Sequence, residues 1–236
     1  MPHLKLLFIT TDRSRHVERS THYLIEELKK KVRLMIWSEH GHLPTILSML
    51  PMKPDFILCN DFKPEYCPFI TGIRETEVPV GILMHDLHYK TKKRKSFIEK
   101  GNIRAIFSHY RDAFLETFPE YKKQFIWFPH HVPVDLFKDY GEPKSTNWLF
   151  IGASFPHLYP LRAKIINVMN GKPGFKKHDH PGYSPVKRAT EHVYTGETYA
   201  REINRAKMLF TCQSYYRLPV LKYFEAAACN TLVLGD

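Results

Sequence analysis

Short apolar runs alternate with amphipathic segments along the first half of the chain. The run at 4–10 is typical of a strand buried in a parallel sheet, and the segment 17–31 places Tyr23, Leu24 and Leu28 on one helical face. This alternation predicts right-handed strand–helix–strand units and a mostly parallel, doubly wound sheet. The expected strands are 4–10, 32–37, 55–59, 78–84, 105–108 and 125–128, and the expected helices are 17–31, 44–50, 92–100 and 111–117.

A polar stretch at 135–146, containing Gly141 and Pro143, interrupts the pattern and is typical of an interdomain linker. We therefore expect an N-terminal domain at 1–134 and a second domain at 147–236. Residues 171–190 are rich in Gly, Pro, His and Lys and are expected to form a mobile loop. The elements expected in the second domain are strands at 147–152, 208–212 and 231–234 and helices at 159–169, at 197–206 and from Pro219 onwards.

The last of these helices contains an unusual acidic residue. Leu221, Phe224 and Ala228 recur at the spacing of a packed face, and Glu225 is the only acid among them. It is expected near the carboxyl edge of the strand that ends at Cys212, where open α/β sheets bind ligands. A carboxylate there can accept hydrogen bonds from both hydroxyls of a ribose, and a glutamate on the helix surface is the alternative.

The turn that follows the strand at 147–152 is a candidate phosphate site. Gly152 and Ser154 allow close approach of a phosphate to the backbone at a helix N-terminus, although the dinucleotide fingerprint GxGxxG is absent. Arg162, in the first turn of the next helix, and Lys222, one turn from Glu225, are candidate phosphate ligands. A solvated helix charge and a helix salt bridge are the respective alternatives.

His85 ends the strand at 78–84, where a ligand of a parallel sheet is expected. It can hydrogen-bond a sugar hydroxyl, or serve a purely structural role. Asp86 and His88 lie beside it, but no third ligand follows at a spacing that favours a metal site, so no metal is expected.

The positive net charge of the chain favours an anionic partner. Lys and Arg number 35 against 24 Asp and Glu, which gives a net charge of +11. Nucleotide phosphates, nucleic acid and a membrane surface are all compatible with such a charge. The basic run 92–95 is read as solvated, with a membrane or acceptor-phosphate role as the alternative. Nucleic acid is disfavoured because no recognisable binding motif is present.

Cysteine usage and hydropathy indicate a cellular location. The four cysteines lack any paired framework, which is typical of a reducing compartment, and no apolar run is long enough to span a membrane. We expect a cytoplasmic protein, at most peripherally attached to a membrane.

Seven segments of the second half of the chain form a combined pattern: 127–130 (WFPH), 134–137 (VDLF), 150–153 (FIGA), 159–162 (YPLR), 199–207 (YAREINRAK), 210–212 (FTC) and 219–234. Through this pattern, most of 78–236 resembles the group 1 glycosyltransferases, and specifically their branch similar to the spore-maturation protein CgeB, whereas 1–77 agrees only in its fold pattern.

The resemblance implies the GT-B fold, in which two Rossmann-like domains act on a nucleotide-sugar donor that is held mainly by the second. The N-terminal domain at 1–134 is then the acceptor-side domain, and 147–236 is the nucleotide-sugar-binding domain. It implies that Glu225 binds the ribose, that Arg162 and Lys222 stabilise the diphosphate leaving group, and that His85 contacts the donor. Transfer is expected to be retaining and independent of a metal or other cofactor.

Three departures from the family pattern are visible. The second glutamate of the group 1 pattern, eight positions before Glu225, is Arg217 here, and a customary glycine is Asn230. The family also implies further strands and helices after Asp236, so the second domain is expected to be short or truncated.

The predicted function is therefore transfer of a sugar from a nucleotide-diphosphate sugar to a glycan, protein or lipid-linked acceptor in surface, spore or polysaccharide assembly. The alternatives are a non-catalytic nucleotide- or glycan-binding module of the same fold, and a basic module that binds anionic surfaces.

Overall fold

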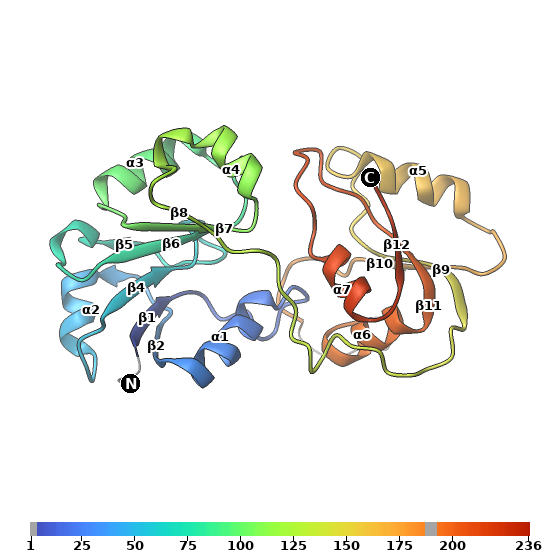
Figure 1. Cartoon of the computed structure of the whole chain (residues 1–236), viewed down its shortest axis with the longest axis horizontal. Helices are drawn as coiled ribbons and strands as arrows, with labels where there is room; N and C mark the ends of the chain where they lie inside the picture. The colour runs from blue at the N-terminus through green and yellow to red at the C-terminus, as the bar shows by residue number, and fades with distance from the viewer. Residues whose placement is uncertain (1–3, 187–192) are drawn as a thin grey trace. The chain divides into compact units, whose positions relative to one another are not determined.

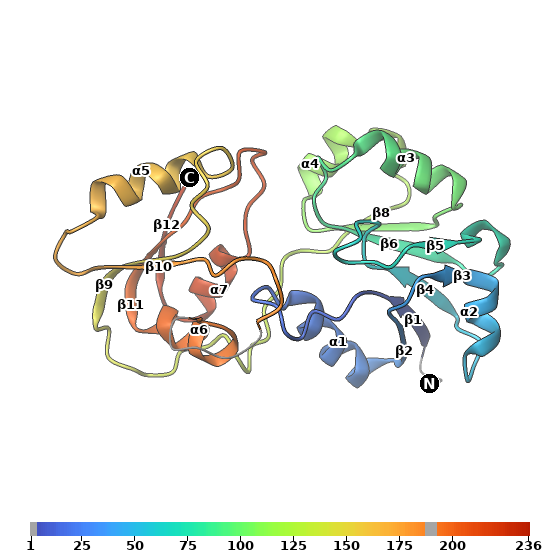
Figure 2. The same ribbon diagram turned by 180° about the vertical axis from the view of Figure 1, so that it is seen from behind.

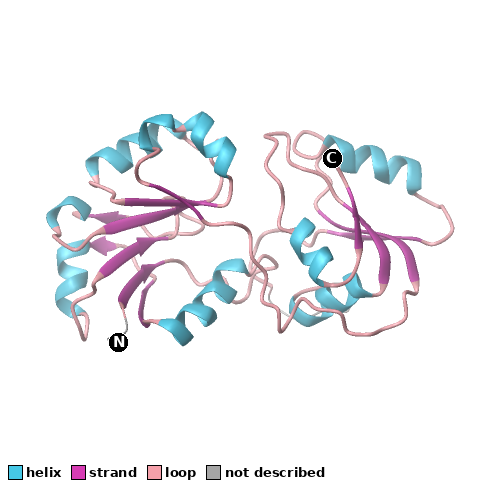
Figure 3. Cartoon of the chain, in the orientation of Figure 1, coloured by secondary structure: helices cyan, strands magenta, loops and turns pink. Residues whose placement is uncertain are grey.

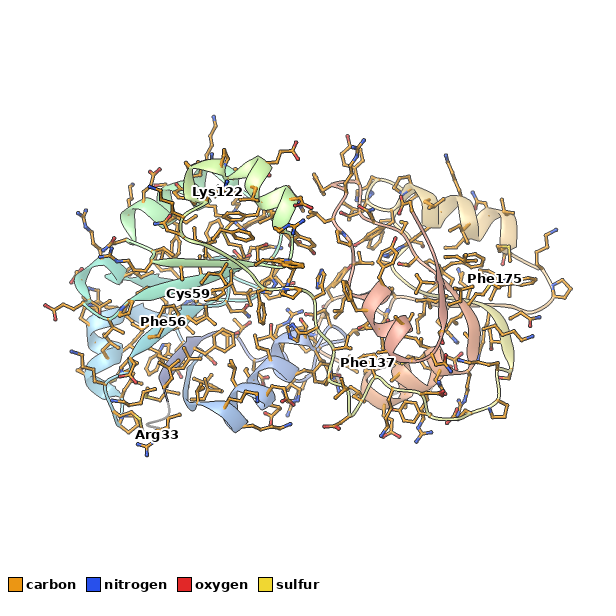
Figure 4. The ribbon with its side chains drawn as sticks, in the orientation of Figure 1. Arg33, Phe56, Cys59, Lys122, Phe137 and Phe175 are labelled. Carbon is orange, nitrogen blue, oxygen red and sulfur yellow. The ribbon has the colours of Figure 1, made fainter. Side chains whose placement is uncertain are left out.

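The computed structural model describes residues 4–186 and 193–236. The chain forms two compact units, one made of Met1–Asp12 and Leu24–Pro129 and the other of Arg13–Tyr23 and His130–Asp236 (Figure 1). Residues 135–146, expected to be a linker, are part of the second unit, and Phe137 from this stretch is buried in its core (Figure 4). The assignment of an acceptor side and a donor side to the two halves of the chain stays a prediction.

The first unit is built on a parallel six-stranded sheet with the order β2-β1-β4-β6-β7-β8. All six strands predicted from the apolar runs are confirmed, each within two residues of its expected bounds. They are β1 (Lys5–Ile9), β2 (Arg33–Trp37), β4 (Phe56–Cys59), β6 (Val80–Met84), β7 (Ala105–Ser108) and β8 (Phe125–Trp127). The described residues add a short parallel pair that the sequence did not predict, β3 (Gly41–His42) and β5 (Ile70–Thr71).

Four helices of this unit confirm the amphipathic segments. They are α1 (Ser20–Lys31), α2 (Leu43–Met49), α3 (Thr91–Lys100) and α4 (Arg111–Thr117), with short 3-10 turns at Ile73–Glu75 and Pro119–Tyr121. The helices α3 and α4 lie over one face of the sheet and α1 lies over the other (Figure 1). The core between these layers contains strand residues such as Leu7, Ile57 and Ile82, none of which is exposed.

The second unit has a parallel four-stranded sheet with the order β10-β9-β11-β12. Its strands are β9 (Thr146–Gly152), β10 (Phe175–Asp179), β11 (Ala206–Phe210) and β12 (Leu232–Leu234), and its helices are α5 (Pro160–Met169), α6 (Gly196–Asn204) and α7 (Lys222–Ala228). Helix α5 covers one face of the sheet, and α6 and α7 cover the other (Figures 2 and 3).

The prediction of a mobile loop at 171–190 is wrong for the part that contains β10. This strand pairs with β9 over its whole length, although its sequence FKKHD carries only one apolar residue. It is an edge strand with partly exposed side chains, so the apolar signal of a buried strand is missing. Residues 187–190 of the predicted loop lie outside the described residues.

The predicted packing of α7 is also wrong in two respects. The helix begins at Lys222, so Pro219 precedes it instead of occupying its first turn. Phe224, expected on the buried face, is 39% exposed, whereas Glu225 and Ala226 are buried. Apolar residues do not mark the buried face of this helix, because the Tyr199 hydroxyl donates a hydrogen bond to Glu225 and so accommodates the acid on that face.

A buried ion pair corrects the interpretation of the basic run 92–95 as solvated. Arg94, in α3, is fully buried, and its Nη2 donates to both carboxylate oxygens of Asp61, at 2.9 and 3.1 Å. Asp61 is equally buried, and it also accepts a hydrogen bond from the backbone N–H of Phe62. The neighbouring Lys92 and Lys93 are exposed, so only part of the run is solvated.

We predict that Arg94→Met lowers the free energy of unfolding by about 3–5 kcal/mol, because the carboxylate of Asp61 then stays buried without its counter-charge. The measurement is urea unfolding of the whole chain. Lys93→Met, one residue away and exposed, is the matched control and should change the free energy of unfolding by less than about 0.5 kcal/mol. Equal effects of the two variants would contradict a structural role for the ion pair.

Candidate functional site

A cavity of about 230 Å³ lies in the second unit, at the carboxyl edge of its parallel sheet. Gly152, at the end of β9, and Asp179, at the end of β10, line it together with residues of α5, α6 and α7. Four of the six residues predicted to form a site line this cavity, namely Arg162, Lys222, Glu225 and Gly152.

Glu225 is the buried acid of the cavity, with 8% of its surface exposed. The hydroxyl of Tyr199, in α6, donates a hydrogen bond to its Oε2 over 2.7 Å. Burial raises the pKa of Glu225, and the nearby Lys222 ammonium and the Tyr199 hydrogen bond oppose that shift only in part. The alternative of a glutamate on the helix surface is therefore wrong.

Lys222, the first residue of α7, brings a cation into the same space. Its ammonium lies 5.5 Å from the centre of the Tyr199 ring. Burial lowers the pKa of Lys222 in spite of the attraction of Glu225. The described part of the chain provides no hydrogen bond and no salt bridge to this ammonium at contact distance, so the predicted alternative of a Lys222–Glu225 salt bridge does not form. Lys222 is partly buried, and an ammonium with so little compensation favours an anionic ligand.

Gly152 makes room for that lysine. Its φ is +133°, a conformation that side-chain-bearing residues rarely adopt, and an added Cβ would meet Cε of Lys222 at 2.8 Å. Glycine at this position therefore allows the lysine stem to pack against the end of β9.

Arg162 has 3% of its surface exposed, so the alternative of a solvated helix charge is wrong. Its guanidinium donates to the carbonyl oxygen of Ala153 at 3.0 Å, to Oγ1 of Thr211 at 3.1 Å and to the carbonyl oxygen of Cys212 at 3.2 Å. It also lies 3.9 Å from the ring centre of Tyr159. Arg162 thus ties together the turns that follow β9 and β11, and its charge meets no carboxylate at salt-bridge distance within the described residues.

The two other predicted site residues lie elsewhere. Ser154 is partly exposed in the turn after β9 and does not line the cavity. His85 follows β6 and belongs to the first unit. Its Nε2 lies 2.6 Å from Oδ1 of Asn60, and its backbone N–H donates to Oδ2 of Asp61 at 3.0 Å.

Sequence reasoning missed several residues of the cavity wall. Tyr199 supports Glu225 from a helix 26 residues earlier, and Glu18 reaches the wall from the segment Arg13–Tyr23. His180 and Tyr183 follow β10, in the stretch expected to be a loop. The pKa of His180 is lowered by its burial and by the positive charges of Lys222 and Arg162. Tyr199 begins the segment 199–207 that carries the resemblance, but its pattern assigns the tyrosine no role, and Glu18, His180 and Tyr183 lie in no motif.

Two structural features are absent from the described residues. No three His, Cys, Asp or Glu side chains come together in an arrangement that would hold a metal ion. No described helix is both long and apolar enough to cross a lipid bilayer.

Comparison with known proteins places the fold. No protein-family model and no curated protein matches the chain. Among solved structures it is similar to an alpha-glucosyltransferase in complex with UDP-glucose and DNA containing an abasic site, with 11% identity and a TM-score of 0.57, over 100% of this chain and 80% of the other.

Two further solved structures are similar to the chain over almost its whole length. Anabaena HepE in complex with UDP and glucose has 11% identity and a TM-score of 0.55, over 99% of this chain and 80% of the other. An alpha1,3-fucosyltransferase has 8% identity and a TM-score of 0.51, over 99% of this chain and 68% of the other. With the two parallel sheets, these likenesses show an α/β fold of the GT-B type with Rossmann-like units, which confirms the predicted fold class.

We predict that Glu225→Gln makes the chain more stable at about pH 7, because the native state buries a charge there that the amide does not carry. A raised pKa means that the native state binds a proton more tightly than the unfolded state, so this glutamate destabilises the fold increasingly as the pH rises from its ordinary pKa through its raised value. The gain should therefore vanish at about pH 4, where both states are protonated.

The measurement for this prediction is urea unfolding of the wild type and of Glu225→Gln at both pH values. Glu197→Gln, on the exposed end of α6, is the control and should show no such gain. A loss of stability in Glu225→Gln at neutral pH would contradict the account of the buried acid.

Proposed function

We propose that this chain is a glycosyltransferase whose second unit binds the nucleoside diphosphate of a sugar donor. The observation that carries the proposal is the pair of opposite charges in one cavity, the buried Glu225 and the partly buried Lys222, neither of which is fully compensated. A nucleoside diphosphate presents the complementary groups, since it has negative phosphates and a ribose with two hydroxyls.

Glu225 is assigned to the ribose. Its Oε2 accepts a hydrogen bond from the Tyr199 hydroxyl, which orients the carboxylate, and Glu225 lines the cavity. A carboxylate accepts hydrogen bonds from two hydroxyls, so a ribose in the cavity would meet a matched acceptor.

Lys222 and Arg162 are assigned to the diphosphate. Negative charge builds up on this group as the bond to the sugar breaks, and cations that are already in place stabilise that charge without reorganisation. Arg162 is held in place by its three hydrogen bonds, whereas Lys222 is positioned by its stem against Gly152. With these cations the transfer needs no metal ion, and no other cofactor is proposed.

The finer features of the proposal come from the resemblance to group 1 glycosyltransferases of the CgeB-like branch. These features are a retaining outcome, contact of His85 with the donor, and an acceptor in surface glycan, spore or polysaccharide assembly. A cytoplasmic protein that attaches peripherally to a membrane is proposed on the same footing. The solved structures of similar fold include complexes with UDP-glucose and with UDP and glucose, which supports a nucleotide-sugar donor.

A binding module without catalysis is the second candidate, and Arg217 favours it. This residue stands where the group 1 pattern has its second glutamate, and it is exposed and does not line the cavity. Nucleotide binding without transfer or hydrolysis of any nucleotide sugar would support the module over the enzyme.

We predict that at least one of UDP, GDP and ADP binds the chain and that Lys222→Met weakens this binding about 10- to 100-fold, the size expected for a lost charge-assisted contact. Isothermal titration calorimetry with the three nucleotides measures the affinities. The matched control is Lys164→Met, an exposed lysine of α5, which should bind as the wild type does.

Either of two results would contradict the proposal. One is that the wild type binds none of the three nucleotides. The other is that Lys222→Met binds as tightly as Lys164→Met, which would place the nucleotide away from the cavity.

A further inference from the structure

A buried carboxylate behind the cavity of the second unit holds a histidine of the cavity wall. Glu202, in α6, has 3% of its surface exposed and does not line the cavity, whereas His178, in β10, does. Nε2 of His178 lies 2.8 Å from Oε1 of Glu202, and Nζ of Lys176 lies 2.6 Å from the same oxygen. His178 therefore connects a buried charge to the space that a ligand would fill.

The contact with Glu202 fixes which nitrogen of His178 carries a proton. Burial acts to raise the pKa of Glu202, but the hydrogen bonds from His178 and Lys176 prevail and lower that pKa to about 2, so the carboxylate is ionised at neutral pH. An ionised carboxylate can only accept hydrogen bonds, so Nε2 of His178 is protonated. In the neutral ring Nδ1 is then a hydrogen-bond acceptor.

Nδ1 of His178 is accessible to a ligand. The described residues give it no hydrogen-bond partner, and it is not among their enclosed polar atoms without one. The side chain is 15% exposed and lies beside the ring of Tyr194, which lines the same cavity with its centre 4.2 Å from that of the imidazole. A nucleobase matches this wall, because it has N–H groups along its edge and a flat face that stacks on aromatic side chains.

Helix α6 places His178 on the ribose side of the cavity, away from the proposed phosphate ligands. Tyr199, which donates to Glu225, and Glu202, which accepts from His178, are three residues apart in α6 and therefore neighbours on its surface. The phosphate ligands come from the other two helices, α5 and α7. The base and the diphosphate are attached to different carbons of the ribose, so a ribose on Glu225 with its phosphates towards α5 and α7 leaves its base towards α6.

We propose that His178 recognises the nucleobase of the donor by accepting a hydrogen bond on Nδ1 from an N–H of the base, and that Glu202 is a positioning residue that orients the ring for this contact. The inference rests on the proposed function for the nucleotide, but the state of the ring follows from the protein alone. Uracil, guanine and adenine each carry an N–H on their pairing edge. The contact therefore requires a base and does not by itself choose among these three.

The first test measures the ring without any nucleotide. Nitrogen-15 labelling of the full chain and long-range proton–nitrogen correlation spectra report which imidazole nitrogen carries the proton, and the His178 signals are assigned by their loss in His178→Phe. The neutral ring of the wild type should carry its proton on Nε2, and this proton should exchange slowly with water. A proton on Nδ1 in the neutral ring would overturn the proposal.

Variants of Glu202 test the positioning role in the same spectra. Glu202→Leu should lose the slowly exchanging Nε2 proton, whereas Glu202→Gln, whose amide oxygen also accepts from Nε2–H, should keep it. An unchanged His178 spectrum in Glu202→Leu would overturn the positioning role.

The second test compares nucleotides with a ligand that lacks the base. UDP, GDP and ADP are titrated calorimetrically, and ribose 5-diphosphate is measured by its displacement of the nucleotide that binds most tightly. His178→Phe should weaken that nucleotide about tenfold or more and leave ribose 5-diphosphate within about threefold, because only the base contact is lost. Glu202→Leu should show the same base-dependent loss, and Glu202→Gln should recover most of it.

His157→Phe is the matched control, because His157 is an exposed histidine of the same unit that does not line the cavity. It should bind both ligands as the wild type does.

Three results of the second test would overturn the base contact. Ribose 5-diphosphate binds the wild type as tightly as the best nucleotide, or His178→Phe weakens both ligands equally, or His178→Phe weakens neither. Any of these, with nucleotides still bound by the wild type, defeats this inference alone. If the wild type binds none of the three nucleotides, the proposed function fails and the base contact fails with it.

Discussion

Charge buried at the carboxyl edge of a parallel sheet is the constraint on which both units of this protein depend. A charged group taken out of water is costly unless a partner of opposite charge or a set of hydrogen bonds replaces the lost hydration. The two units meet this constraint differently. In the first, Arg94 and Asp61 pair directly and are fully buried. In the second, Lys222 and Glu225 share a cavity without a direct pair.

This difference separates a structural site from a functional one. The Asp61 carboxylate is occupied by the guanidinium of Arg94 and by backbone N–H groups, so it holds the turn after β4 and leaves little room for a ligand. In the cavity, burial shifts the pKa of Glu225 upward and that of Lys222 downward, so each group is driven towards its neutral form. A ligand with phosphates and vicinal hydroxyls would relieve both costs at once. Uncompensated charges that lower the stability of the fold are typical of a binding site.

The sheets could be predicted from the sequence because buried parallel strands are continuous apolar runs, and each predicted strand of the first unit lies within two residues of its expected bounds. The two buried charged residues that depart from the local pattern share one cause, which is that a distant partner accommodates each of them. Glu225 is buried because Tyr199 donates to it, and Arg94 is buried because Asp61 accepts from it. A charged residue in a sequence is read as exposed unless its partner is known, and neither partner is near in sequence.

Only part of the candidate site could be predicted from the sequence. Glu225, Lys222, Arg162 and Gly152 were found because they follow strands at the edge where parallel sheets bind ligands, and the structure brings them to one cavity. The walls from β10 and from Glu18 could not be found, because β10 lacks an apolar run and Glu18 comes from a segment far from the others in sequence. Ser154 has the right residue type after β9 but lies outside the cavity lining.

The most direct test of the account is a crystal structure of the chain with a bound nucleoside diphosphate. The account predicts the ribose hydroxyls on the carboxylate of Glu225 and the phosphates beside Lys222 and Arg162, with the Tyr199 hydroxyl still on Oε2. A nucleotide bound outside this cavity, or bound within it with Glu225 away from the ribose, would contradict the account.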